Sequence, residues 1–186
     1  MPRRWAFAAW PALLAPPLEA SAEPITAANW RKHPAIVEIR AIYQETRQAE
    51  VAGRLRKEQR TSDCEDIQRV LYLNAGGSIR SYHYRGSSSD SWVKIAYYYD
   101  RDRALRFAFV QAGAFNGTSI EFRVYFSKAG ERLWQERRDL KGPGWTFLDH
   151  RSDDWLVKDP KRDFEFESGE CPMENGQDEE TSAGRQ

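Results

Sequence analysis

The spacing of hydrophobic residues changes along the chain, from a helical period to strict alternation. Ile36 and Ile39 recur at the spacing of one helix face, and polar residues fall largely on the opposite side. Pro34 suits the first helical position, where its missing N–H costs nothing. This pattern predicts a helix from Pro34 to Val51, ended at Gly53.

After this segment the alternation of hydrophobic and polar residues predicts a series of short strands. We expect strands at residues 55–62 (a polar edge strand), 67–73, 78–85, 92–99, 105–112, 118–126 and 132–138. Asn116-Gly117 favours a tight type I′ hairpin turn. Short strands joined by short turns form an antiparallel meander. The predicted fold class is therefore α+β, with one N-terminal helix packed on one face of a six- or seven-stranded antiparallel β-meander.

Alternation also predicts which residues share a face of this sheet. The apolar face is expected to carry Val93, Ile95, Tyr97, Tyr99, Leu105, Phe107, Phe109, Ile120, Phe122, Val124 and Phe126. We expect the helix to lie across that face. The opposite face is expected to be exposed and to carry Lys94, Arg106, Glu121, Arg123 and Tyr125.

Three segments, 72–80, 98–106 and 125–133, resemble one another, with a strand end, a polar turn and a strand restart. Gly77 and Gly130 occupy a turn position that needs positive φ, where the second copy has Arg103. The segments are similar to YD-type or MORN-type hairpin repeats of bacterial surface and toxin-associated proteins, and the helix-plus-meander layout resembles cystatin-like folds. The starts of the three segments are 26 and 27 residues apart, about two strands plus two turns, which predicts that their three turns lie on one edge of the sheet. Recurrent turn chemistry and shared ancestry are the two explanations of the similarity among the segments.

The N-terminus has the organisation of a secretory signal. Arg3 and Arg4 precede an uncharged, mostly apolar run over 5–18 and the small residues Ala20-Ser21-Ala22. We expect cleavage after Ala22 and a periplasmic or secreted protein with no stable membrane insertion, because the run is shorter than the roughly 20 apolar residues of a membrane span. The alternative is an amphipathic N-terminal helix of a cytosolic protein.

The positions of the cysteines and of the charged residues predict a basic domain followed by an acidic tail. Cys64 and Cys171 predict one disulfide in an exported protein, the alternative being a free Cys171. Residues 163–186 hold eight acidic residues and a single arginine, although the whole chain has 28 basic and 28 acidic residues. We therefore expect a single basic domain at 23–162 and an acidic, disordered tail at 163–186 that either stays solvated or screens the basic body.

Motifs for catalysis are absent from the sequence. The three histidines, His33, His83 and His150, lack helical zinc-site spacing, and no nucleophile elbow or phosphate loop occurs. We expect no catalytic residue, no metal and no cofactor. The alternative is a hydrolase of a cell-envelope polymer that uses His83, Asp149 or His150, and a third possibility is a structural protein with no dedicated ligand.

The predicted exposed face supplies the candidate binding residues Arg106, Glu121, Arg123 and Tyr125. Arginine and tyrosine are common anchors of interfaces, so this face suits an acidic or aromatic-rich protein partner. A cross-strand ladder of ion pairs is the alternative. We expect a non-catalytic binding or inhibitor module of the cell envelope, with a protein partner and no nucleic acid. The oligomeric state stays open.

Overall fold

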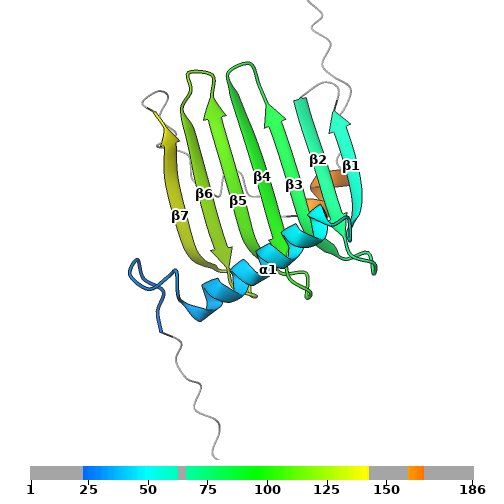
Figure 1. Cartoon of the computed structure of the whole chain (residues 1–186). Helices are drawn as coiled ribbons and strands as arrows, with labels where there is room; N and C mark the ends of the chain where they lie inside the picture. The colour runs from blue at the N-terminus through cyan, green and yellow to red at the C-terminus, as the bar shows by residue number, and fades with distance from the viewer. Residues whose placement is uncertain (1–22, 63–65, 143–158, 166–186) are drawn as a thin grey trace, which may run out of the picture.

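A computed structural model describes residues 23–62, 66–142 and 159–165 (Figure 1). The elements are α1 (Pro34–Val51), β1 (Arg56–Ser62), β2 (Asp66–Leu73), β3 (Ile79–Ser87), β4 (Ser91–Tyr99), β5 (Leu105–Ala114), β6 (Ser119–Phe126), β7 (Arg132–Lys141) and α2 (Pro160–Glu165). The seven strands form one antiparallel sheet in sequence order. The predicted α+β layout, with an N-terminal helix and a β-meander, is confirmed.

The helix α1 crosses one side of the sheet near the turns that join β4 to β5 and β6 to β7 (Figure 1). Its apolar residues Ile36 and Ile39 are fully buried. They pack in one cluster with Tyr98, Phe107 and Tyr125. We call the side of the sheet that carries these three aromatic residues the front face.

The prediction that α1 covers the face of Ile95 and Tyr97 is therefore wrong. These two residues belong to a separate cluster on the opposite, back face. Both faces of the sheet carry an apolar cluster, and the helix packs on the smaller one.

Alternation also predicts Phe107 on the face of Ile95, but a register shift pairs Leu105 with Tyr99 and Phe107 with Tyr98. The shift places Phe107 and Phe109 on the front face, which simple alternation does not anticipate. The β6 residues Ile120, Phe122, Val124 and Phe126 share the back face with Ile95 and Tyr97, as alternation predicts.

The back face holds the larger core and receives the helix α2, which lies behind the sheet in Figure 1. Phe164 of α2 is buried in this core. Asp163 accepts a hydrogen bond from the Tyr82 hydroxyl and lies 3.7 Å from Nε of Arg69. Burial and then the Asp163 carboxylate raise the pKa of Tyr82 well above its usual value.

The boundary predicted between residues 162 and 163 thus falls inside α2. Asp163 and Phe164, assigned from sequence to the acidic tail, contact the sheet. Residues 166–186 of that tail lie outside the described residues, as do the predicted signal segment 1–22 and both cysteines, Cys64 and Cys171.

Three turns at the edge near α1 share one construction. The first residue of each turn donates its N–H to the carbonyl of the fifth, at 2.9 Å for Asn74, 3.0 Å for Asp100 and 2.8 Å for Ser127. The fourth residue has positive φ, and it is Gly77, Arg103 or Gly130. The prediction that the three similar segments place their turns on one edge is confirmed.

Each of these turns is followed by a residue that the strand pairing skips. The skipped residues are Arg80, Arg106 and Leu133. Nη2 of Arg80 donates to Oγ1 of Thr46 on α1 at 3.5 Å, and Leu133 packs in the cluster under α1. A β-bulge turns its extra residue out of the regular alternation. The three hairpins therefore each direct one side chain to the helix side of the sheet.

The turn at Asn116-Gly117 differs from the predicted type I′ form. A type I′ turn needs positive φ at both central residues, and among the described non-glycine residues only Arg103 has it. Ala114 donates its N–H to the Thr118 carbonyl at 2.9 Å, so the loop is longer than two residues. The Asn116 side chain accepts from the Thr118 N–H at 3.0 Å, which stabilises this wider turn.

Candidate anion-binding groove

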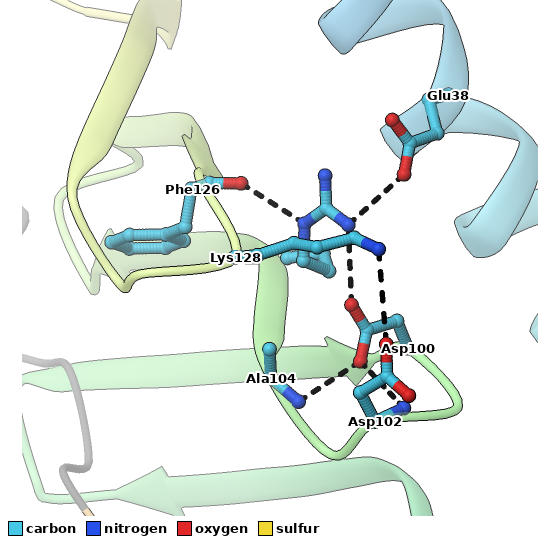
Figure 2. A network of polar contacts seen from close by, with 7 residues as sticks. Glu38, Asp100, Asp102, Ala104, Phe126 and Lys128 are labelled. Carbon is cyan, nitrogen blue, oxygen red and sulfur yellow. Dashed lines mark hydrogen bonds and ion pairs between the residues drawn. The ribbon is translucent and has the colours of Figure 1, made fainter. Parts of the chain in front are cut away.

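Arg106, predicted to lie on an exposed face, is buried beneath α1. Its side chain is 3% exposed. Nε donates to the Phe126 carbonyl at 3.2 Å, and Nη1 lies 3.1 Å from carboxylate oxygens of both Glu38 and Asp100 (Figure 2). Its bulge position turns it toward the helix, so the expectation of exposure is wrong for this residue.

Asp100 joins this ion pair to the turn that follows β4. One carboxylate oxygen accepts from the N–H groups of Asp102 and Ala104, at 2.9 Å and 3.0 Å, while the other binds Arg106 (Figure 2). Lys128 and Asp102 form only an exposed pair at 3.7 Å. Arg106 thus connects α1, the turn and β6, and its surroundings suit a structural role.

The other predicted binding residues differ in exposure. Glu121 and Tyr125 are buried, at 6% and 3% exposed, so the expectation of exposure is wrong for both. Nη2 of Arg123 lies 2.6 Å from Glu121, and Nη1 lies 3.4 Å from Glu136. Arg123 also places its guanidinium carbon 5.4 Å from the centre of the Phe109 ring. Glu121 therefore positions Arg123, which reaches the surface.

The front face consists of four cross-strand rows, of which α1 covers the first, and the row farthest from α1 comprises Asp66, Ser87, Trp92, Gly113 and Ser119. The covered row contains Tyr98, Phe107 and Tyr125. The next row comprises Val70, His83, Ala96, Phe109, Arg123 and Glu136. The third row comprises Gln68, Arg85, Lys94, Gln111, Glu121 and Arg138.

Two cavities lie on this face beside α1. One, of about 350 Å³, lies over β5 to β7 and includes Trp30, Arg40 and Tyr125 in its lining. The other, of about 470 Å³, lies over β2 to β5. Both are lined by Tyr43 and Phe109, so they adjoin. We call the two cavities together the front groove.

The charged residues that line the front groove are strongly unbalanced. The single acidic lining residue is Glu136. The basic lining residues are Arg31, Arg40, Arg47, Lys57, Arg85, Lys94, Arg123 and Arg138. Such an excess of one sign over an apolar floor concentrates a field that attracts anions.

Part of this positive charge has no carboxylate partner. Arg47 pairs with Glu50, and Arg138 pairs with Glu136 at 2.9 Å. Within residues 23–62, 66–142 and 159–165, no ion pair involves Lys57, Arg85 or Lys94. Arg85 and Lys94 are direct cross-strand partners, an arrangement of like charges that costs stability.

A buried carboxylate, Glu50, lies behind the β2–β4 part of the groove. Its side chain is 3% exposed and contacts Ser81 Oγ at 2.5 Å, Arg47 Nη1 at 2.5 Å and His83 Nε2 at 3.2 Å. Burial alone would raise the pKa of Glu50, but His83, Ser81 and Arg47 outweigh it and hold the pKa below its usual value. The cluster fixes the end of α1 to β3.

The arrangement of this cluster does not match a catalytic triad. Glu50 lies between Ser81 and His83, whereas a triad places the histidine between the serine and the carboxylate. Asp149 and His150, the other residues of the hydrolase alternative, lie outside the described residues. Sequence reasoning missed Glu50, although a carboxylate in the last turn of a helix is unfavourable next to the helix dipole and is a signal of a specific partner.

Comparisons with known proteins give no relative. No protein-family model, curated protein or solved structure matches the chain at a significant level. Within the described residues, no group of three or more histidine, cysteine and acidic side chains is placed to hold a metal ion. None of the described helices is both long and apolar enough to cross a membrane.

Proposed function

We propose that this chain is a non-catalytic binding module that holds an acidic segment of a protein partner in the front groove. The observation that carries the proposal is the charge imbalance of the groove, in which eight basic residues and one acidic residue surround an apolar floor. The proposed setting is the periplasm or the exterior of the cell, on the basis of the N-terminal sequence.

The polar groups of the third row suit carboxylates. Arg85 and Lys94 offer only hydrogen-bond donors, and the amides of Gln68 and Gln111 beside them can add further donors. Carboxylates accept such bonds at several oxygens, and charge-assisted bonds are about twice as strong as neutral ones. The apolar floor of Val70 and Phe109 strengthens these pairs by lowering the local dielectric constant.

Binding of a labelled hexaglutamate peptide to the mature chain, residues 23–186, tests the proposal. Arg85→Glu with Lys94→Glu should weaken binding at least about tenfold and should reduce its salt dependence. The matched control is Arg101→Glu with Lys128→Glu, which makes the same charge change at an exposed turn edge away from the groove. Equal losses in both variants, or no loss in the groove variant, would refute the proposed site.

The proposed location is tested separately by sequencing the N-terminus of the protein recovered from its source cells. Cleavage after Ala22 gives a mature chain that begins at Glu23. A protein that retains residues 1–22 in the soluble fraction of the cell interior would contradict export and would leave the groove assignment intact.

A further inference from the structure

The two cavities of the front groove differ in chemistry. The cavity over β5 to β7 is lined by five aromatic rings, from Trp30, Tyr43, Phe107, Phe109 and Tyr125. The cavity over β2 to β5 is lined by the cations Lys57, Arg85 and Lys94, which pair with no carboxylate of the described residues. A ligand that fills both cavities therefore needs an aromatic group for the first and an anionic group for the second.

The rings that line the aromatic cavity pack on one another. Trp30 stacks on Trp134 with ring centres 5.7 Å apart, and it also contacts Tyr125 at 6.0 Å. Phe107 lies 5.0 Å from Tyr125 and 5.4 Å from Tyr43. Since these rings are held by one another and by α1, an incoming side chain enters a preformed site and little ordering is required of the protein.

The guanidinium groups of three arginines lie over aromatic rings that line this cavity. The guanidinium carbons of Arg31 and Arg40 lie 5.3 Å and 5.1 Å from the centre of the Trp30 ring. Nη1 of Arg40 donates to the Arg31 carbonyl at 2.9 Å, and Arg123 lies over Phe109. Arginine stacks on aromatic faces, so such an arrangement favours an aromatic guest over an aliphatic one.

The size of the cavity limits the guest. Its volume of about 350 Å³ is at the lower end of ligand cavities in proteins, which span about 300–1,000 Å³. It suits one large side chain, inserted from a partner as the anchor of an interface. Buried aromatic anchors of this kind supply most of the affinity of many protein interfaces.

We infer that the partner segment places one aromatic side chain in the cavity over β5 to β7 and its acidic residues over Arg85 and Lys94. This inference rests on the proposed function and specifies its ligand. Lys94 is on β4 and Arg123 on β6, and two strand spacings of about 4.8 Å make roughly 10 Å. An extended chain covers that distance in about three residues, so the acidic and aromatic groups are separated by about three positions.

The test compares three labelled peptides on the mature chain by fluorescence anisotropy. The first is Glu-Glu-Glu-Ser-Gly-Trp, the second has serine in place of the tryptophan, and the third has the tryptophan directly after the glutamates. The first should bind at least about tenfold more tightly than the second, as for a buried aromatic anchor, and more tightly than the third. Equal affinity of the first and second peptides overturns the inference and leaves the proposed function standing.

A protein variant gives an independent check. Gln44 is an exposed residue of α1 that lines the aromatic cavity, so Gln44→Trp should fill the cavity without disturbing the core. It should remove the advantage of the tryptophan peptide and leave binding of the serine peptide unchanged. If Gln44→Trp leaves that advantage intact, the assigned cavity is wrong.

Two further outcomes would refute the proposed function together with the inference. If none of the three peptides binds in low salt, both fail. If inorganic polyphosphate binds more tightly than the tryptophan peptide and competes with it, the groove serves a phosphate polymer, and both the peptide partner and its aromatic anchor are refuted.

Discussion

Arg85 and Lys94 project from directly opposite positions on β3 and β4 to the same face of the sheet, and no carboxylate of the described residues pairs with either. Directly opposed like charges destabilise a sheet. The pair therefore lowers the stability of the free protein, as expected where a charge arrangement serves an anionic ligand.

Replacement of one member of this pair should stabilise the fold. Arg85→Glu creates an opposite-charge pair with Lys94, and the free energy of unfolding should rise by about 0.5–1 kcal/mol. Urea unfolding at low salt measures the change. Arg101→Glu, which breaks an exposed pair with Glu45, should show no gain. A lower urea midpoint for Arg85→Glu would show that the two like charges do not oppose each other.

The buried network of Arg106 should be far less tolerant. Arg106→Met leaves the Asp100 carboxylate, 9% exposed, without its partner, and unfolding free energy should fall by about 3 kcal/mol. Adding Asp100→Asn should recover part of this loss, because the amide oxygen can still accept from the turn and no buried charge remains. Thermal unfolding of the single and double variants checks this, and no recovery in the double variant would contradict the ion-pair account.

Glu50 should make stability depend on pH in the acid range. Its pKa in the folded chain is lowered, whereas in the unfolded chain it has the ordinary value of about 4.3. Its contribution is therefore present above about pH 4.3 and is lost as the pH falls through the lowered folded value. The stability difference between the wild type and Glu50→Gln should shrink as the pH falls below about 4. A difference that stays constant from pH 7 to pH 3 would exclude this role.

The three similar turns provide a matched test of backbone strain. Arg103 has φ of 69°, in the region that glycine occupies in the other two turns. Arg103→Gly should raise stability by up to about 1 kcal/mol, because a left-handed conformation costs other residues about 1–2 kcal/mol. Gly77→Ala should lower stability by about 1 kcal/mol from the backbone alone, because no atom lies within 4 Å of the added Cβ. Chemical unfolding of both variants is the measurement, and changes of the same sign would contradict the argument.

The sequence predicted the elements of this fold much better than their faces. Helix α1 and the seven strands follow from hydrophobic spacing, because that spacing reflects local geometry. Phe107 and Phe109 lie on the opposite face from the predicted one, since the one-residue bulge at Arg106 reverses the alternation within β5 and leaves only a weak trace in the sequence. The predicted position of α1 is wrong because both faces of the sheet carry an apolar cluster, and alternation does not say which one the helix covers.

The candidate site was only partly predictable for the same reason. Arg123 and Tyr125 do line the groove, whereas Glu121 holds Arg123 from within and Arg106 belongs to the separate ion-pair network with Asp100. Arg85 lies on a different strand from the residues chosen, and its relation to Lys94 depends on a strand register that alternation does not determine.

The sequential order of the strands also has a consequence for how the chain folds. Each strand pairs only with its neighbours in sequence, so every hairpin can form as soon as its second strand is available. The helix α1 comes first in the chain, yet the aromatic residues it covers, Tyr98, Phe107 and Tyr125, come much later. The apolar residues of α1 therefore stay exposed to solvent until β6 has been synthesised, and docking of α1 on the sheet is expected to be a late step of folding. In a chain that is exported across a membrane in the unfolded state, α1 would dock on the sheet only after β6 has been translocated.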